Sequence, residues 1–541
     1  MRISHIEITN HSRIGDLALD VRGHAVIVGA NDVGKSSVLR LLNLLLGSST
    51  GTLYQQLGLS DLRNPLAALT IRVTLIGFED EDRALFTSEI DIAESDQAET
   101  LRVQMTVSPD PDDEDTVDIR RWFPDAGHQR APTRDQLLRF GWRYLPATRN
   151  ASASAVDGPN SALQTLLRAI ELGAERSELT DLLASFNTRL DASTAIGQLR
   201  DAAASHLSKA MPRRVGKDDL AVRTATDPDE DVLGGVSMFF KDGDDYRPMT
   251  EQSDGLRQLV SMTLFDLAEG TANVVAIDEP ELHLHPSSQR TVAELFGTAS
   301  NQKLLVTHSP FIVQRFEPAD VIAVNRDGLC HQIPADRLSA VEKERINWWS
   351  PRLLEVLTAR YALIVEGLTD RVVVERAAHL AGIALDRIGA VVFDIDGAHK
   401  FPHVYRLLGS AGFNVPLLGL VDDKEKAVWH GAIGGKPKNV FGTTLFVSTP
   451  DLEGETCAAF GGPAAAQALI DGGYCQKAGI LQSAGVADLS EVTAEAAAAY
   501  CRAGKVSAAI ALASQLDSAT AAKIASVSGL LQRLIALDGT A

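Results

Sequence analysis

Apolar and polar positions alternate at the start of the chain, where Ile3, Ile6 and Ile8 predict a strand with one buried face. The later run HAVIVGAND predicts a buried strand that enters a glycine turn. It is followed by SSVLRLLNLLLG, whose leucines and closing glycine predict a buried helix. Strand, loop and helix therefore come in the order that a phosphate-binding unit requires.

The same pattern divides the rest of the chain. Residues 68–125 alternate apolar segments with acidic turns and predict antiparallel strands, whereas about 160–212 has apolar residues three and four apart and predicts an inserted helical arm. From Tyr361, short apolar strands separated by helical or loop segments predict βαβ units and a parallel sheet, with an Ala-rich helical part after about 460. We therefore expect an α/β protein with a first domain over 1–350 and a second over 360–541.

Composition limits the class of protein. At 541 residues, with 45% hydrophobic and 23% charged residues, the chain is expected to form two or more ordinary domains. There is no apolar run of the roughly 18 residues that a membrane span needs, and the first residues lack the pattern of a signal peptide. We expect a cytoplasmic protein with no membrane contact. The four cysteines lack C-x-x-C spacing and predict reduced thiols, without a zinc cluster or disulfides.

The net charge of -20 counts against nucleic-acid binding, which needs clustered Lys and Arg. The charge is unevenly distributed, however, because residues 361–541 hold 14 basic and 18 acidic side chains. Two acidic runs, at 109–118 and 227–232, indicate solvated loops. The last third is therefore close to neutral, and bound cations would mask several of its acids.

Residues 29–36, GANDVGKS, match the pattern G-x-x-x-x-G-K-S/T after a buried strand. Glycines let backbone amides face phosphates, Lys35 neutralises their charge, and the Ser36 hydroxyl suits magnesium at a helix N-terminus. The alternative is a plain glycine turn before an ordinary helix. The expected nucleotide-binding residues here are Asn31, Gly34, Lys35, Ser36 and Ser37.

Two further strand ends carry ATPase chemistry. The strand VVAID ends in Asp278, which can hold the magnesium shell, and Glu279 beside it can polarise the attacking water. The strand LLVTHSP ends in His308, which we expect to contact the γ-phosphate or the hydrolytic water. Each motif alone also fits a solvated strand end or a structural histidine, and the P-loop upstream favours the catalytic interpretation.

The segment Ser253-Asp254-Gly255 resembles the signature motif of ABC ATPases, and residues 1–350 resemble the ABC head family, including its DNA-repair members. The resemblance implies that heads pair, with Ser253 and Gly255 of one subunit facing ATP held by the other. Asp254 stands where many members have Gly. Either Gln55 or Gln56 would be the Q-loop residue, and ELHLHP, with two histidines, favours a D-loop-like segment over a metal site.

Acidic residues follow three of the strands expected in the second domain. In a parallel sheet the carboxyl ends of the strands face one crevice, so these acids are expected to converge there. Such clustering is costly unless cations compensate it, and several carboxylates suit magnesium or manganese. The acids are Glu366 and Asp370, then Asp394 and Asp396, then Asp422, Asp423 and Glu425.

This pattern resembles the Toprim domain, and with the preceding head the chain looks like an OLD (overcoming lysogenisation defect) family nuclease, to which the Gabija defence nuclease is related. The resemblance assigns Glu366 with Asp370, Asp394 with Asp396, and Asp422 with Asp423 or Glu425 to three metal-binding motifs, and Glu453 to a later acidic position. Lys505 matches a late lysine that faces transition-state charge. The implied cofactors are ATP and Mg²⁺, with Mn²⁺ as the alternative ion at the nuclease site.

The leading hypothesis is an ATP-binding and ATP-hydrolysing, metal-dependent DNA endonuclease in phage defence or DNA processing. Its expected partners are DNA and a second copy of the chain, which would pair through the head or the helical arm. A helicase is a further candidate partner. The alternative is a DNA-repair or SMC-like ATPase whose Toprim domain is not catalytic. Metal-dependent nicking by the purified protein separates the two hypotheses.

Overall fold

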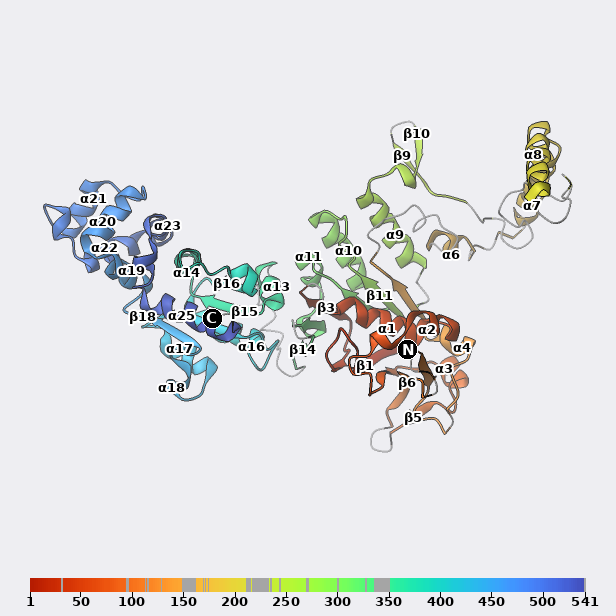
Figure 1. The fold of residues 1–541 in the computed structure, drawn as a ribbon, viewed down its shortest axis with the longest axis horizontal. Coiled ribbons are helices and arrows are strands. Elements are labelled where there is room, and N and C mark those ends of the chain that lie inside the picture. Colours follow the sequence, from red (N-terminus) through yellow and green to blue (C-terminus); the bar gives the residue numbers. More distant parts are fainter. Residues whose placement is uncertain are drawn as a thin grey trace. The chain divides into compact units, whose positions relative to one another are not determined.

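Figure 1 shows the chain as a computed structural model. It describes the whole sequence except residues 31–32, 94–96, 112, 114–115, 128, 148–161, 169, 171, 174, 211–215, 217–232, 234–235, 243–244, 269–271, 299–300, 326–327, 335–350 and 540–541. The chain forms two compact units, one of Met1–Phe140 with Gln302–Ala541 and one of Gly141–Asn301. Within the described part, none of the helices is long and apolar enough to cross a membrane.

An antiparallel sheet opens the first unit, as the alternation over 68–125 predicts. Its strand order is β2-β1-β4-β6-β5, and β7 also pairs with β6. Buried and part-exposed residues alternate along the whole of β4, so one face of this strand packs into the core. The strands are β1 (Arg2–Thr9), β2 (Leu17–Asp20), β4 (Leu69–Ile76), β5 (Ile90–Ile92), β6 (Glu99–Pro109) and β7 (Val117–Trp122).

A second, mostly parallel set of strands positions the P-loop. β3 (Ala25–Gly29) lies between β12 (Gln302–Val306) and β13 (Val321–Val324) and is parallel to both, while β14 (Cys330–Gln332) is antiparallel to β13. Every residue of β3, β12 and β13 is buried, as in a sheet covered on both faces. The adjoining helices are α1 (Lys35–Gly47), α2 (Thr50–Gln56), α3 (Asp80–Leu85), α4 (Arg134–Arg139) and α11 (Pro310–Val313).

The carboxyl-terminal part of this unit holds a four-stranded parallel sheet of order β16-β15-β17-β18. Leu418 and Leu420 pack into a core with α14 and α25, whereas Gly419 between them faces the ring of Trp429 on the opposite face. The strands are β15 (Tyr361–Val365), β16 (Ala390–Asp394), β17 (Leu417–Asp422) and β18 (Leu445–Ser448). The parallel α/β prediction for this region is confirmed.

Helices cover this sheet and form a separate Ala-rich cluster, seen in blue in Figure 1. The sheet is flanked by α13 (Pro351–Thr358), α14 (Leu368–Leu380), α15 (Leu385–Ile388), α16 (Phe401–Leu408), α17 (Lys426–Ile433), α18 (Pro437–Val440) and α25 (Ala525–Asp538). The cluster contains α19 (Leu452–Phe460), α20 (Gly462–Asp471), α21 (Lys477–Ala484), α22 (Ala494–Ala503) and α23 (Lys505–Gln515), and α24 (Ser518–Ala521) follows it. Small alanine side chains let these short helices approach closely, so the cluster needs few large residues.

The second unit contains helices in the range where the sequence predicts a helical arm. Two helices, α7 (Glu175–Asp191) and α8 (Thr194–Ala210), lie within the predicted range 160–212, and α7 has no buried residue. In the rest of the unit, β11 pairs in parallel with β8, and α6 packs on α9. The remaining elements are β8 (Trp142–Leu145), α6 (Ala162–Arg168), β9 (Phe239–Asp242), β10 (Asp245–Pro248), α9 (Asp254–Ala268), β11 (Val274–Asp278) and α10 (Pro286–Thr298).

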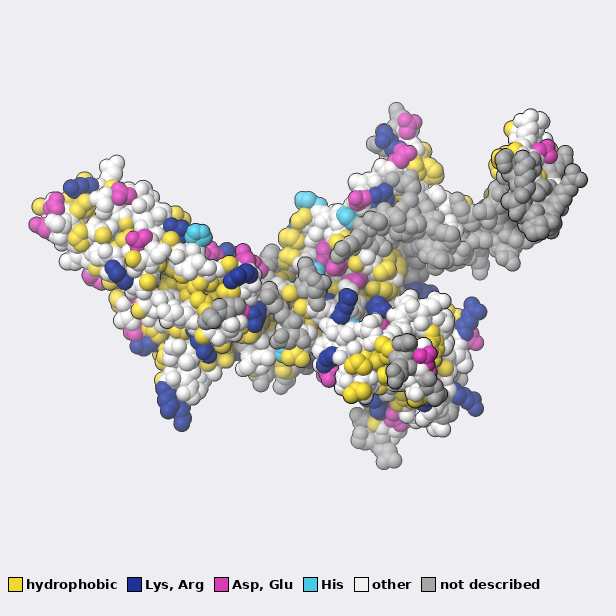
Figure 2. All heavy atoms as spheres, viewed as in Figure 1, with side chains coloured by type: hydrophobic (Ala, Val, Ile, Leu, Met, Phe, Trp, Pro, Cys, Tyr) yellow, Lys and Arg dark blue, Asp and Glu magenta, His cyan; other side chains and the backbone are white. Residues whose placement is uncertain are grey.

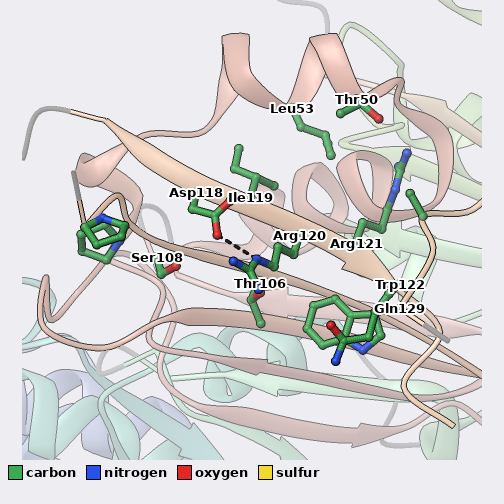
Figure 3. Close-up of a pocket in the computed structure, with 13 residues that line it drawn as sticks. Thr50, Leu53, Thr106, Ser108, Asp118, Ile119, Arg120, Arg121, Trp122 and Gln129 are labelled. Carbon is green, nitrogen blue, oxygen red and sulfur yellow. Dashed lines mark hydrogen bonds and ion pairs between the residues drawn. The ribbon is translucent and has the colours of Figure 1, made fainter. Parts of the chain in front are cut away.

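A cavity of about 710 Å³ lies beside β7 and is lined by α2, β6 and β7 (Figure 3). Arg120 and Arg121 leave β7 on opposite faces. Arg120 is exposed and pairs with Asp118, whereas the buried Arg121 donates to the carbonyls of Leu44, Leu45 and Ser48. Burial lowers the pKa of the Arg121 guanidinium. Arg121 thus satisfies carbonyl groups at the end of α1 that have no partner within the helix.

Replacing Arg121 with Ala should therefore destabilise the protein. The change leaves three buried carbonyls without this donor and removes buried packing, which predicts a loss of about 3 kcal/mol in the free energy of unfolding. The neighbouring Arg120→Ala variant loses only an exposed ion pair and should stay within about 0.5 kcal/mol of wild type. Urea unfolding followed by circular dichroism measures both, and equal midpoints for the two variants would contradict this role of Arg121.

Candidate active sites

The P-loop leaves β3 at Gly29 and enters α1 at Lys35. Gly34 has φ 89°, and a Cβ on it would lie 2.6 Å from the Arg13 carbonyl oxygen. A Cβ on Gly29 would meet the Val324 carbonyl oxygen at 2.4 Å. Both positions therefore require glycine, the first for its backbone conformation as well as for space.

Lys35, which is almost fully buried, donates from Nζ to the carbonyl of Ala30 at 2.6 Å. Ser36 and Ser37 follow in the first turn of α1, so their hydroxyls start at the helix end that favours anions. Asn31 lies outside the described residues. Gln55 and Gln56 are both exposed at the end of α2, and the choice between them stays open.

The strand β11 in the second unit ends in the buried carboxylate of Asp278. Glu279 directly after it has φ 49°, so the backbone turns sharply between the two acids. Ser253 directly precedes α9, and its Oγ accepts a long hydrogen bond from the Leu256 N–H at 3.4 Å. A Cβ on Gly255 would lie 2.8 Å from the carbonyl oxygen of His283, so the signature-like segment contacts the ELHLHP segment through a position where only glycine fits.

His308 lies just beyond β12 in the first unit and is exposed. The preceding Thr307 donates its N–H to the carbonyl of Ile27 on the P-loop strand at 3.1 Å, so His308 starts beside β3. A cavity of about 250 Å³ opens here and is lined by residues 307–310, Val28, Val313 and three residues of α13, Leu354, Glu355 and Thr358. Apart from the Q-loop candidates at the end of α2, the sequence-predicted ATPase residues that are described therefore lie at or beside a strand end or a helix start.

Four carboxylates gather at the carboxyl end of the parallel sheet. Glu366 directly follows β15, Asp422 ends β17, and Asp370 and Glu453 lie in the first turns of α14 and α19. Glu366 Oε1 accepts from the Asp422 N–H at 2.9 Å, and Asp422 Oδ1 accepts from the Leu452 N–H at 3.1 Å. We call Glu366, Asp370, Asp422 and Glu453 the acidic cluster.

Burial and mutual repulsion shift the titration of this cluster. Burial, reinforced by the charges of Asp422, Glu366 and Glu453, raises the pKa of Asp370 to about 8, although the Gly367 N–H bond opposes the shift. Burial and the charges of Glu366 and Glu453 raise the pKa of Asp422 to about 7, and burial also raises the pKa of Glu366. Perturbations of this kind mark functional sites more often than ordinary surfaces.

Basic groups border the cluster. Lys505 Nζ lies 3.0 Å from Glu453 Oε1; burial opposes the charged form of Lys505, but the hydrogen bond to Glu453 raises its pKa overall. Arg502 holds both oxygens of Asp451, at 2.8 and 3.0 Å, and so fixes the start of the helix that carries Glu453. The sequence pattern does not single out Asp451 or Arg502, because only the fold brings α19 and α22 together.

The other acids expected at this site have different surroundings. Asp394 pairs with Arg352 at 2.7 Å and with Arg371 at 3.4 Å. Asp396 is exposed and pairs with Lys400 at 2.9 Å, and this lysine lowers the pKa of Asp396. The structure therefore does not join these two acids to the acidic cluster.

The third motif is split between two environments. Asp422 is part of the cluster, whereas the half-exposed Asp423 pairs with Lys426 at 2.6 Å. Glu425 directly precedes α17, and its charge contributes to the raised pKa of Glu366. The described residues contain no group of three or more His, Cys, Asp or Glu placed to hold a metal ion as they stand. The cluster offers only oxygen donors with excess negative charge, which is the donor set that magnesium or manganese prefers.

Comparison with known proteins gives the same two parts. Residues 25–314 match the family model described as "AAA domain, putative AbiEii toxin, Type IV TA system", and residues 357–423 match "Overcoming lysogenization defect protein-like, TOPRIM domain". The chain is 23% identical over 398 residues to an OLD nuclease of Thermus scotoductus, covering 68% of this chain and 72% of that protein.

Two solved structures are also similar. The C-terminal region of the Burkholderia pseudomallei OLD protein is 23% identical, covers 33% of this chain and 98% of its own, and has a TM-score of 0.28. An SmcHead bound to the C-winged helix domain of ScpA is 17% identical, covers 64% of this chain and 100% of its own, and has a TM-score of 0.37.

The class of protein is therefore an ATPase head joined to a Toprim domain. The chain belongs to the AAA-domain family whose model it matches, and with its OLD-like Toprim domain it has the make-up of an OLD family ATPase-nuclease. The predicted resemblance to this family is confirmed, while the relationship to the Gabija nuclease stays a prediction.

The raised pKa values predict how stability depends on pH without metal. The folded protein keeps protons on Asp370 and Asp422 up to about pH 8 and pH 7, whereas an ordinary aspartate loses its proton near 3.8. These groups therefore stabilise the fold fully only at low pH, and that contribution is lost as the pH rises through the folded pKa values. We expect the thermal unfolding midpoint in EDTA to fall between about pH 5 and about pH 8, and Asp370→Asn to reduce this fall.

The matched control is Asp386→Asn, at an exposed carboxylate on α15. It should leave the pH dependence as in wild type. If Asp370→Asn and Asp386→Asn have the same pH dependence as wild type, Asp370 is not the buried, proton-holding group described above.

Proposed function

We propose that this protein binds and hydrolyses ATP through its head and cleaves DNA with a divalent metal ion at the acidic cluster. The observation that carries the proposal is the gathering of four mutually repelling carboxylates at one end of a parallel sheet, with Asp422 and Glu453 buried and Glu366 and Asp370 part-buried. Without a bound cation, the repulsion between these carboxylates would destabilise the fold at neutral pH. Mg²⁺ or Mn²⁺ would offset this repulsion.

Glu366, Asp370, Asp422 and Glu453 are the proposed metal-holding residues. A bound ion would act as a Lewis acid on the phosphodiester and would lower the pKa of an attacking water. Glu366, which accepts the Asp422 N–H, would orient that water, and Lys505, which pairs with Glu453, would stabilise charge that develops on the phosphate. Asp423 and Glu425 remain alternatives for a second ligand of the third motif.

Asp394 and Asp396 have a less direct proposed role. Asp394 is held by two arginines, so we assign it to positioning the end of β16 beside Glu366 rather than to metal binding. Asp396 retains a possible ligand role only if it leaves Lys400.

In the head, Lys35, Ser36 and Ser37 are proposed to bind the phosphates and magnesium, together with Asn31, Gly34 and Asp278. Glu279 would activate the hydrolytic water, with His308 contacting it or the γ-phosphate. Ser253 and Gly255 would act on ATP held by a second copy, so the proposed active form is a dimer, formed through the heads or through the exposed α7–α8 arm. A role in phage defence or DNA processing, in the cytoplasm, and a helicase partner are part of the same proposal.

Glu366→Gln should abolish nicking of supercoiled plasmid in magnesium or manganese while ATP hydrolysis stays near wild type. The substitution keeps the shape of the side chain but removes its charge, and the expected loss is about a hundredfold or more. Asp422→Asn should behave in the same way, and Lys505→Ala should slow cleavage less severely. Agarose-gel nicking assays with EDTA controls measure the rates, with Asp471→Asn on α20 as an exposed matched control.

Wild-type nicking by Glu366→Gln, after contaminating nuclease has been excluded, would refute the catalytic role. The Toprim domain would then be a binding module, and the DNA-repair or SMC-like ATPase would become the better description.

Two head variants should separate ATP binding from hydrolysis. Lys35→Ala should lose ATP binding because the phosphate charge is no longer neutralised, whereas Glu279→Gln should bind ATP and hydrolyse it at least about tenfold more slowly. Filter binding of labelled ATP and phosphate release measure the two steps. Hydrolysis by Glu279→Gln at the wild-type rate would show that another group activates the water.

A further inference from the structure

The chain carries a local excess of positive charge directly after the acidic cluster. β17 ends at Asp422, and residues 424–440 then contain four lysines and a single acidic residue, Glu425. This segment consists of α17, a turn and α18. This segment is positive although the whole protein has a net charge of -20, so it is a candidate binding surface for an anionic partner.

Three of these lysines are available to a partner. Lys424, Lys436 and Lys438 are exposed, and none has an ion-pair partner among the residues that the structure describes, whereas Lys426 pairs with Asp423. Figure 2 shows Lys and Arg side chains at the tip of the α17–α18 segment without acidic ones beside them. Lys424 lies two residues after Asp422, the last residue of β17, so the basic segment begins directly beside the acidic cluster.

The segment is held firmly against the sheet. Trp429 of α17 is fully buried, stacks on Phe401 with ring centroids 3.9 Å apart, and donates from Nε1 to the Ala398 carbonyl at 3.0 Å. His430 stacks on Phe441, with centroids 5.3 Å apart, and so closes the segment at its far end. The lysines therefore project from an anchored support, which limits the entropy that binding would cost.

The turn between the two helices also has a defined conformation. Gly434 and Gly435 have φ values of 76° and 85°, which glycine adopts at little cost. Pro437 then starts α18 with a fixed φ, between Lys436 and Lys438. The two lysines thus flank a restrained helix start.

We propose that Lys424, Lys436 and Lys438 form a basic platform that binds the phosphate backbone of DNA and leads it to the acidic cluster. The inference rests on the proposed function, in which DNA is the substrate. Lysines act as point charges on phosphates and carry no base recognition, so binding through the platform is independent of sequence. The positive segment also offsets the repulsion between DNA and the acidic cluster.

The test is the double variant Lys436→Gln/Lys438→Gln of the full chain, with a short labelled DNA duplex in EDTA. Two lost phosphate contacts should reduce the slope of log K against log salt by about 2 and weaken binding about tenfold at moderate salt. Fluorescence anisotropy over a salt series measures both quantities. In nicking assays with metal, the apparent KM for plasmid should rise while kcat stays at the wild-type value.

The matched control is Lys477→Gln/Lys523→Gln, which removes the same charge from exposed positions on α21 and after α24. It should bind DNA as wild type does. Equal weakening of the two double variants, or an unchanged salt slope in Lys436→Gln/Lys438→Gln with its unfolding midpoint intact, would overturn the platform.

Different results would refute the basic platform and the proposed nuclease activity. A wild-type protein that binds DNA with the lysine-dependent slope but never nicks it supports the platform and refutes the nuclease. A protein that nicks DNA, but whose binding is insensitive to Lys436 and Lys438, supports the nuclease and refutes the platform.

Discussion

Buried like charges are the constraint on which the carboxyl-terminal domain depends. Glu366 and Asp422 stand at the ends of neighbouring parallel strands, so the sheet itself forces their carboxylates together. Backbone amides and Lys505 offset only part of the repulsion, and the pKa of Asp370 rises to about 8. The surrounding apolar packing must therefore stabilise the domain enough to tolerate a cluster that favours protons or cations.

Periodicity predicted most of the fold because each element depends on local pattern. The alternating segment at 69–76 became β4 with one buried face, and the fully apolar runs after Tyr361 became parallel strands with no exposed side. The sequence pattern predicted fewer of the contacts between elements. Nothing near Arg121 in the sequence indicates that it reaches the end of α1, because Leu44 and Leu45 are 77 and 76 residues away along the chain.

At the candidate site, the sequence predicted the acids but not the side chains that pair with them. Acids at strand ends were found, but their partners were not: Asp394 has the same strand-end position as Asp422, yet Arg352 and Arg371 neutralise it. Those arginines come from α13 and α14, and spacing along the chain does not reveal which strand end each will reach. Lys424 stands between Asp423 and Glu425, and spacing along the chain does not reveal that its charge acts on Glu366.

Net charge is a poor guide to the partner of such a protein, because screening makes electrostatic recognition local. At physiological salt the Debye length is about 8 Å, so a phosphate responds to the lysines it touches and hardly at all to acids on distant loops. Residues 424–440 are positive although the chain as a whole has a charge of -20. If DNA is the substrate as proposed, the remaining negative charge would repel it from surfaces away from the acidic cluster. Attraction at the platform and repulsion elsewhere would together favour approach at the acidic cluster.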